Sequence, residues 1–502
     1  MAIVSVPAFP RSRVVPSFGL ALTIIAIVTV VRLVGLHFSV VDLFYDESQY
    51  WAWSRELAFG YFSKPPLLAW IIALSGHVCG SSEACVRAPA PILYFGTSLL
   101  VYAIARQLYD TRVAFFAALS IALATGVAFS ARIASTDVPL LFFWSLALFA
   151  YVKLLAHEDW GWGLVLGLSL GLGMLAKYAM IYFLLGIMFA AWLDRDARRL
   201  LLRPTLWFAF GVGVLLLVPN FVWNAQHSFD TLREVGNNAR GNGLRLDPMG
   251  ALEFVGSQFA VFGPIVFSVM LFSFARIASP SIERADRLMI AFALPPLVII
   301  TALGFLGRAN ANWAATAFIS GVILAVALLL RRKAWNWLAA SIACGILVQV
   351  LLLVGDAMAT RLHLPIGGDI YHRTLGWRSL GEQVGQLAQR VGARTIVVDG
   401  RAEAASLLYY WRDRPQQILA WRQSAGPEND FEITHPLTDS APQPFLYVTT
   451  CPSIGQLTKY FADAVRVGQI VTPTGPTSAR SYWAFKLSGP RGPIPPGGGC
   501  AG

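Results

Sequence analysis

The segment PSFGLALTIIAIVTVVRLVGL, residues 16–36, contains a single charged side chain, that of Arg32. The hydrocarbon core of a bilayer is about 30 Å thick, and about 20 apolar residues in a helix cross it. Residues 16–36 are therefore predicted to form a transmembrane helix. No small-residue cleavage site follows directly, so we expect a membrane anchor and not a signal peptide that is removed.

Further segments of the same apolar character follow along the chain. They lie at residues 89–107, 113–131, 138–156, 162–176, 179–193, 205–222, 251–275, 288–306, 314–330 and 336–355. Together with residues 16–36 they predict an α-helical polytopic membrane protein with about eleven transmembrane helices. The fifth and sixth segments are short and are separated only by Lys177 and Tyr178, so a single bent helix is the alternative there.

Composition supports a membrane protein, because 56% of the 502 residues are hydrophobic and only 13% are charged. A soluble domain carries about 25% charged residues, and half of that leaves too little charge to cover a water-facing surface. The net charge of +11 does not indicate a nucleic-acid partner, since the basic residues occupy short gaps between apolar segments and not one face or stripe.

The basic residues also predict an orientation. Residues 195–203 include four arginines, and residues 331–333 are three consecutive basic residues. Positive charge concentrates in cytoplasmic loops. The pattern predicts a cytoplasmic N-terminus and a C-terminus on the outer side, and it favours two helices on either side of Lys177.

The first outer loop, residues 37–88, is expected to hold two interfacial helices. ESQYWAWSRELAFGYF, residues 47–62, spaces its aromatic side chains roughly as a helix does, and such residues favour the membrane interface. PPLLAWIIALSGHVCG, residues 65–80, is too short to span comfortably. Cys79 and Cys85 of this loop either form a disulfide or pack as two small residues. No CxxC pair or Cys/His cluster indicates a zinc site.

The composition changes after Gly355. Residues 377–392 and 402–411 have helical patterns, and residues 393–400, 444–450 and 481–487 have strand patterns. We expect a transmembrane domain at residues 1–355, a small α/β domain at 356–490 and a disordered Pro/Gly-rich tail at 491–502.

Acidic residues on the outer side are candidates for chemistry. Asp46 and Glu47 follow the first span, and Asp137 begins the fourth. A loop acid is usually only solvated, and Asp137 could instead cap the helix that Pro139 helps to start. Even so, the first and fourth spans bring these acids to one membrane face, as a shared site requires.

Basic residues on the same side are candidates for anion binding. Lys64 precedes the second interfacial helix, Lys177 lies between two spans, and Arg308 follows the ninth span, just before Asn310, Asn312 and Trp313. The structural alternatives are a snorkelling lysine, a polar break between helices and an interfacial turn. Acids can activate a hydroxyl nucleophile, and cations can stabilise a departing phosphate.

Two stretches carry a resemblance to a known family. Residues 45–110, beginning YDESQYWAWSRELAFGYFSKPPLLAW, and residues 134–152, ASTDVPLLFFWSLALFAYV, resemble the C-type (GT-C) membrane glycosyltransferases. The branch is the bacterial one related to protein O-mannosyltransferases and the lipid A aminoarabinose transferase. The similarity runs from about residue 16 to 330, and EAASLLYYWRDRP, residues 403–415, more weakly resembles the start of the family's periplasmic domain.

The resemblance implies inverting transfer of a sugar from a polyprenyl-phosphate donor. The acceptor would be lipid A, lipopolysaccharide core, another glycan or a protein, at the periplasmic face of the bacterial inner membrane. Asp46 and Asp137 match the family's catalytic acids, Lys64 matches its phosphate-binding lysine, Lys177 falls where its fifth and sixth spans meet, and Arg308 matches by region and not by motif; all three cations are expected to bind the donor phosphate. We also expect Glu47, Tyr50 and Asn312 to lie beside donor or acceptor. Ser63 stands where the family often has an acid or histidine, so we expect no required metal and no other cofactor.

Two other classes of function remain as alternatives: a flippase or transporter of lipid-linked sugars, and a non-catalytic scaffold for envelope assembly. Transporters favour binding sites near the middle of the membrane, whereas the acids here cluster at one face. The sequence therefore favours the enzyme.

Overall fold

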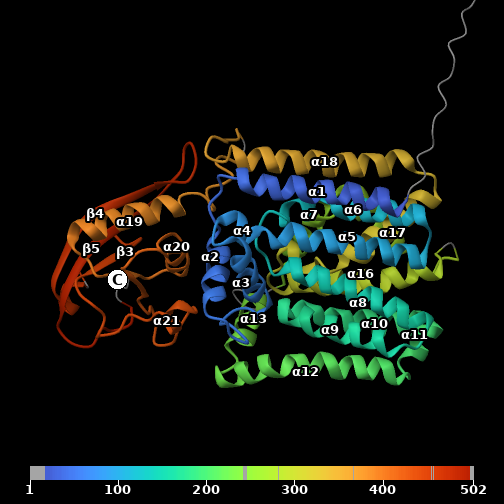
Figure 1. The fold of residues 1–502 in the computed structure, drawn as a ribbon, viewed down its shortest axis with the longest axis horizontal. Coiled ribbons are helices and arrows are strands. Elements are labelled where there is room, and N and C mark those ends of the chain that lie inside the picture. Colours follow the sequence, from blue (N-terminus) through green and yellow to red (C-terminus); the bar gives the residue numbers. More distant parts are fainter. Residues whose placement is uncertain are drawn as a thin grey trace, which may run out of the picture.

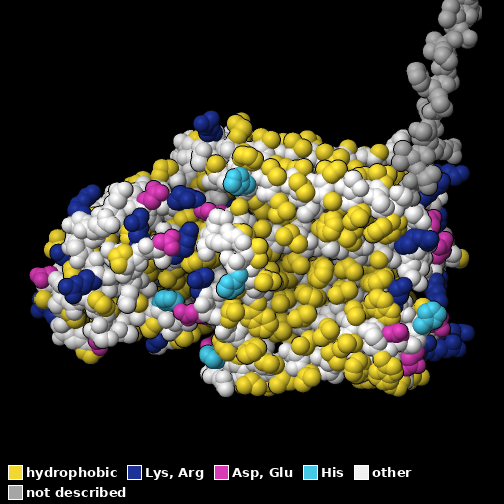
Figure 2. Space-filling view, viewed as in Figure 1, with side chains coloured by type: hydrophobic (Ala, Val, Ile, Leu, Met, Phe, Trp, Pro, Cys, Tyr) yellow, Lys and Arg dark blue, Asp and Glu magenta, His cyan; other side chains and the backbone are white. Residues whose placement is uncertain are grey.

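A computed structural model describes residues 17–240, 246–280, 282–365, 367–453, 455 and 457–497. Its helices form one long bundle, and a single β-sheet domain lies beyond one end of the bundle (Figure 1). Figure 2 shows apolar side chains covering the flank of the bundle, while charged side chains gather at its far end and over the sheet domain. This arrangement is that of a multi-pass membrane protein.

The bundle contains all the predicted apolar segments. Its helices are α1 (Phe18–Phe38), α5 (Pro89–Leu108), α6 (Thr111–Ala122), α7 (Thr125–Ser130), α8 (Asp137–Ala156), α9 (Trp160–Ala176), α10 (Tyr182–Leu193), α11 (Arg195–Leu200), α12 (Pro204–Gln226), α14 (Pro248–Val261), α15 (Pro264–Ala275), α16 (Arg284–Leu306), α17 (Ala317–Arg331) and α18 (Trp335–Ala357). Each predicted span is helical, but two are broken. The third divides into α6 and α7, and the eighth divides into α14 and α15, where Pro264 lacks the N–H that a continuing helix needs.

The helices differ in what surrounds them. Every residue of α17 from Ala317 to Leu329 is buried, as is expected of a helix that is hydrophobic all round. In contrast, α1, α12 and α18 leave large apolar side chains such as Val34, Leu215 and Leu351 about half or more exposed. These outer helices present the faces that lipid would cover.

The fifth and sixth spans are two helices. The side chain of Lys177, just after α9, contacts Asp137 at the start of α8, whereas Arg203, beyond α10, donates a hydrogen bond to the carbonyl of Leu154 near the end of α8. The chain therefore travels the length of α8 again between Lys177 and Arg203. A short 3₁₀ turn, Tyr178–Ile181, separates α9 from α10.

The long loop at residues 37–88 forms three helices that lie between the bundle and the sheet domain (Figure 1). They are α2 (Tyr45–Arg55), α3 (Leu67–Cys79) and α4 (Glu83–Arg87), so both predicted interfacial helices are confirmed as helices. Cys79 and Cys85 form a disulfide that joins α3 to α4. The second long loop contributes α13 (Asp230–Arg240).

The C-terminal domain is a five-stranded mixed sheet with the strand order β2-β1-β3-β5-β4. Its elements are α19 (Trp377–Val391), β1 (Thr395–Val398), α20 (Arg401–Tyr410), β2 (Gln417–Ala420), α21 (Phe431–Thr434), β3 (Phe445–Thr449), α22 (Leu457–Tyr460), β4 (Phe461–Pro473) and β5 (Ala479–Pro490). The predicted helices and strands are α19, α20, β1, β3 and β5, whereas β2 and β4 were not predicted. The small α/β domain is thereby confirmed.

The tail predicted to be disordered begins at Arg491, and the structure describes it as far as Gly497. The N–H of Ile494 donates to Asp439, the indole of Trp421 donates to the carbonyl of Pro495, and the N–H of Gly497 donates to the carbonyl of Arg422. Residues 491–497 are thus hydrogen-bonded to the sheet domain. Residues 498–502 lie outside the described part of the chain.

Candidate active site

Most of the predicted site residues meet at the end of the bundle that faces the sheet domain. Asp46 and Tyr50 come from α2, Lys64 from the turn before α3, Asp137 from the first turn of α8, and Lys177 from the end of α9. Asp137 and Lys177 lie where the apolar stretches of α8 and α9 begin and end, whereas Asp46, Tyr50 and Lys64 belong to the loop between α1 and α5. Polar side chains from distant parts of the sequence therefore meet at one surface.

Asp137 is a buried carboxylate with three side-chain partners. Its Oδ1 lies 2.6 Å from Nζ of Lys177, and its Oδ2 accepts a hydrogen bond from Nδ2 of Asn312 at 2.6 Å. The hydroxyl of Ser135 donates to the same Oδ2 at 3.3 Å. The alternative role as a helix cap is not supported, because Thr136 occupies the N-cap position of α8 and the carboxylate binds side chains instead.

Asp46 forms an ion pair with an arginine of the C-terminal domain. Its Oδ1 lies 2.8 Å from Nη2 of Arg401, the first residue of α20. Nη1 of the same arginine donates to Oε1 of Gln49 at 2.7 Å. The Asp46 side chain is 38% exposed, so it remains accessible to a substrate.

Lys64 is a cation without a protein partner, since its ammonium makes no ion pair or hydrogen bond with any residue that the structure describes. Burial lowers the pKa of Lys64 from its ordinary value, and the nearby charge of Lys177 lowers it further. The charges of Asp46 and Asp137 act in the opposite direction and raise the pKa of Lys64. A half-buried ammonium of this kind is suited to an anionic ligand.

Tyr50 lies buried beside these charges. Burial raises the pKa of Tyr50 well above its ordinary value, and the carboxylate of Asp46 adds to the rise. The phenol therefore keeps its proton at neutral pH, and over the described ranges its hydroxyl has no hydrogen-bond partner. It can donate a hydrogen bond to a ligand.

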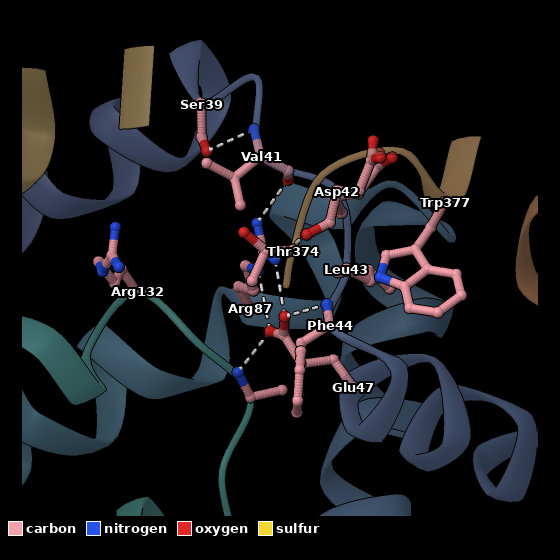
Figure 3. Close-up of polar contacts among 12 residues, drawn as sticks. Ser39, Val41, Asp42, Leu43, Phe44, Glu47, Arg87, Arg132, Thr374 and Trp377 are labelled. Carbon is pink, nitrogen blue, oxygen red and sulfur yellow. Dashed lines mark hydrogen bonds and ion pairs between the residues drawn. The ribbon is translucent and has the colours of Figure 1, made fainter. Parts of the chain in front are cut away.

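Glu47 is bound to other partners than the residues of this cluster. Its two carboxylate oxygens bind the guanidinium of Arg87 at 2.9 and 2.7 Å and also accept the backbone N–H groups of Phe44 and Ala134 (Figure 3). Its side chain is 3% exposed. Arg87 in turn donates to the carbonyls of Val41 and Asp42. Glu47 connects the first loop to α4 and to the segment between α7 and α8, and the structure does not place it where a substrate could reach it.

Arg308 is the predicted residue that the structure does not bring into contact with the others. It is exposed, and within the described ranges its side chain makes no ion pair or hydrogen bond. It lies four residues before Asn312, in the loop that carries Asn312 to Asp137. Its exposed guanidinium is accessible to a ligand.

Metal binding has no support from geometry. No group of three or more His, Cys, Asp or Glu side chains is arranged to hold a metal ion in the part of the chain that the structure describes. Ser63, where the family often has a possible ligand, is buried. That no metal is required stays a prediction.

Two residues of the C-terminal domain that were not predicted to take part reach α2. Arg401 reaches Asp46, and Asp430 accepts a hydrogen bond of 2.7 Å from the indole of Trp53 on α2. The weak family resemblance covers residues 403–415 and does not include Arg401, which precedes this stretch by two positions. Arg87, the partner of Glu47, was also missed, although a lone arginine between apolar segments was a visible signal.

The arrangement combines three chemical capacities: an accessible carboxylate, a second carboxylate fixed by Lys177 and Asn312, and an unpaired ammonium. A carboxylate can accept the proton of an attacking hydroxyl. A preorganised cation stabilises negative charge that develops on a leaving group.

Comparison with known proteins identifies the family. Residues 63–223 match the family of dolichyl-phosphate-mannose-protein mannosyltransferases. The chain is 32% identical over 405 residues to the lipid A galacturonosyltransferase RgtD of Rhizobium johnstonii, a match that covers 80% of this chain and 85% of that protein. It is 29% identical over 266 residues to the lipopolysaccharide core galacturonosyltransferase RgtA of the same organism, covering 51% of this chain and 52% of that protein.

A solved structure shares the fold. The crystal structure of ArnT from Cupriavidus metallidurans bound to undecaprenyl phosphate matches with a TM-score of 0.66 and 19% identity, covering 95% of this chain and all of that one. The likeness supports the same architecture of helical bundle and C-terminal domain. Since the match to RgtD spans most of both chains, this protein belongs to the C-type membrane glycosyltransferases and is itself a glycosyltransferase.

Proposed function

We propose that this glycosyltransferase moves a galacturonosyl group from a polyprenyl-phosphate carrier to a hydroxyl of lipid A, at the outer face of a bacterial inner membrane. The similarity to RgtD over 80% of the chain supports the sugar and the acceptor. The undecaprenyl phosphate named for the structure of ArnT supports a lipid-phosphate carrier.

The observation that carries the proposal is the position of Lys64. This unpaired cation lies within electrostatic reach of Asp46, Asp137 and Lys177. A phosphate needs a cation that no protein carboxylate already occupies, and Lys64 is such a cation. Arg308, exposed and unpaired within the described chain, would supply a second contact once the donor is bound.

Asp46 would act as the general base. It accepts the proton of the acceptor hydroxyl while the hydroxyl oxygen forms its bond to C1 of the sugar. The bond between C1 and the phosphate oxygen breaks, and the electron pair leaves with the polyprenyl phosphate. Direct displacement of this kind inverts the configuration at C1, and no covalent sugar–enzyme intermediate is needed.

Asp137 would hold the other side of the site. Its carboxylate is fixed by Lys177, just after α9, and by Asn312, in the loop between α16 and α17, so it can orient donor or acceptor without moving. Lys177 is neutralised by this pair. Lys64 is thus left to stabilise the charge that develops on the departing phosphate.

The outer face of the membrane is proposed on two grounds. The distribution of basic loops favours a position outside the cytoplasm for this end of the bundle. The disulfide between Cys79 and Cys85 lies at the same end, and disulfides persist in oxidising compartments such as the periplasm.

The test uses the purified full chain in lipid nanodiscs, with polyprenyl-phosphate galacturonate labelled in the sugar and lipid A as acceptor. Release of polyprenyl phosphate together with labelled lipid A is expected, and omission of lipid A should stop both. Transfer to another envelope glycan or to protein, with none to lipid A, would reject the acceptor. In sealed vesicles, passage of intact donor across the bilayer without sugar transfer would support the flippase instead.

A further inference from the structure

We propose that Arg401, contributed by the C-terminal sheet domain, binds the carboxylate of the sugar on the donor and so sets specificity for an acidic sugar. This inference rests on the proposed function, because a uronosyl donor is what brings a second anion to the site. It gives the C-terminal domain a part in substrate recognition.

The guanidinium of Arg401 is held in place by three residues of α2. Nη2 binds Asp46 at 2.8 Å, Nη1 binds Gln49 at 2.7 Å, and Cζ lies 5.0 Å from the centroid of the Tyr45 ring. Contact with an aromatic face and hydrogen bonds from both terminal nitrogens restrict the plane of a guanidinium. Arg401 is therefore positioned before any substrate arrives.

Arg401 also has hydrogen-bonding capacity to spare. A guanidinium carries five N–H donors and no acceptor. Asp46 and Gln49 use one nitrogen each, and Nε has no partner in the described part of the chain. The side chain is 36% exposed, so the unused donors can reach a ligand. The planar fork of an arginine matches a carboxylate better than the point charge of a lysine does.

The charge at this end of the bundle matches a donor with two anions. The carboxylates of Asp46 and Asp137 lie beside three cations, which are Lys64, Lys177 and Arg401, so one positive charge remains unbalanced within the cluster. The exposed Arg308, which contacts neither acid, adds a second positive charge in the loop that leads to Asn312. The buried pair of Glu47 and Arg87 is neutral and separate. A polyprenyl-phosphate uronate carries one negative charge on the phosphodiester and one on the sugar, and so matches these two positive charges.

The two anions can be assigned to different cations. Lys64 lies near Lys177 and has no carboxylate partner, which suits the phosphate. Arg401 is hydrogen-bonded to Asp46. Asp46 must lie close to C1 of the sugar when it accepts the proton of the acceptor. A carboxylate on the same sugar ring is therefore closer to Arg401 than the lipid end of the donor is.

The experiment compares three variants with the wild-type full chain in nanodiscs: Arg401→Gln, Arg401→Lys and the control Arg412→Gln. Arg412 also comes from the C-terminal domain, and its guanidinium lies 5.9 Å from the ring of Trp51 on α2, but it does not contact either acid of the site. Two quantities are measured: KM for polyprenyl-phosphate galacturonate and the inhibition constant of polyprenyl phosphate, which has the phosphate but no sugar.

Arg401→Gln is expected to raise KM for the uronate donor about 10- to 100-fold, the range for loss of a charge-assisted hydrogen-bonded contact. Inhibition by polyprenyl phosphate should not change. Arg401→Lys should recover part of the affinity because it keeps the charge but loses the fork, and Arg412→Gln should behave as wild type. Inhibition by polyprenyl phosphate also reports whether each variant retains a folded site.

Three outcomes would overturn the inference while leaving the proposed function intact, provided that wild-type protein transfers galacturonate. The first is an unchanged KM for the donor. The second is an equal rise in KM and in the inhibition constant of polyprenyl phosphate, which would mean that Arg401 only maintains the site as a whole. The third is a rise in KM for lipid A alone, which would assign Arg401 to the acceptor. A wild-type protein that transfers no galacturonate would overturn both proposals.

Discussion

Oε2 of Glu47 lies 2.7 Å from Nη2 of Arg87, in an ion pair whose side chains are 3% and 4% exposed. Asp46, the preceding residue, is 38% exposed and reaches Arg401 instead. Consecutive residues of an α-helix point about 100° apart, so one of these acids faces the protein interior and the other faces the site. The two neighbours are therefore expected to respond differently to substitution.

Glu47→Gln should reduce stability. The substitution leaves the buried guanidinium of Arg87 without its counter-charge, and breaking a buried pair costs about 3–5 kcal/mol. Thermal unfolding in detergent should show a clear decrease in Tm. Glu56→Gln, on an exposed residue of the same loop, serves as the control and should unfold like wild type. Equal Tm values for both variants would contradict the structural role of Glu47.

Asp46→Asn should reduce turnover while the fold and donor binding survive. Removal of a positioned general base typically costs about 10²–10⁴-fold in rate. Acceptor-dependent release of polyprenyl phosphate is the measurement, at matched protein levels and with Glu56→Gln again as control. Near wild-type turnover of Asp46→Asn would remove the basis for placing catalysis at this loop.

Asp137 and Lys177 should behave as a coupled pair. Their charged atoms are 2.6 Å apart, so either single substitution, Asp137→Asn or Lys177→Met, leaves the other charge partly buried and unpaired. The double variant should then lose less Tm than the sum of the two single losses, as contacting residues do. Strict additivity would show that the pair is not formed in the membrane-embedded protein. In activity, we expect Asp137→Asn to be less damaging than Asp46→Asn or Lys64→Ala.

The value of kcat/KM should fall at alkaline pH as Lys64 loses its proton; this fall is called the alkaline limb of the pH profile. Burial and the charge of Lys177 lower the pKa of this lysine from 10.5, so the ammonium is lost as pH rises through a value below 10.5. Stabilisation of the leaving phosphate is present below that pH and absent above it. The limb should appear in the pH profile of kcat/KM, which reports the free enzyme.

Lys64→Arg tests the assignment of that limb. A guanidinium stays protonated throughout the accessible pH range, so the limb should move to higher pH in this variant. Lys64→Ala should lower kcat at every pH, because the cation is gone. An unchanged alkaline limb in Lys64→Arg would mean that another group controls it.

Topology can be tested with alkaline phosphatase fusions. A fusion after Gly355, near the end of α18, should be active because that end is expected to lie outside the cytoplasm. A fusion after Arg332, between α17 and α18, should be inactive. The reverse pair of results would invert the whole orientation and place the site on the cytoplasmic side.

Parts of the fold could be read directly from the sequence because they depend on local composition. An apolar segment long enough to cross a bilayer is recognisable on its own, and every predicted span proved helical. The breaks were harder to predict. The interruption between α6 and α7 has no proline, and β4 is exposed along much of its length at the edge of the sheet, so it lacks the apolar alternation that reveals a strand.

The sequence by itself determined which residues could lie at the end of the bundle, because the ends of the apolar segments place Asp46, Lys64, Asp137 and Lys177 at the same membrane face. It did not determine their partners. Asp46 and Glu47 are adjacent acids of similar chemistry, and only packing decided that one is buried against Arg87 while the other faces Arg401, 355 positions away. The physical reason is that hydropathy is a local property of the chain. The pairing of charges depends on which surfaces come together after the helices and the sheet domain have packed.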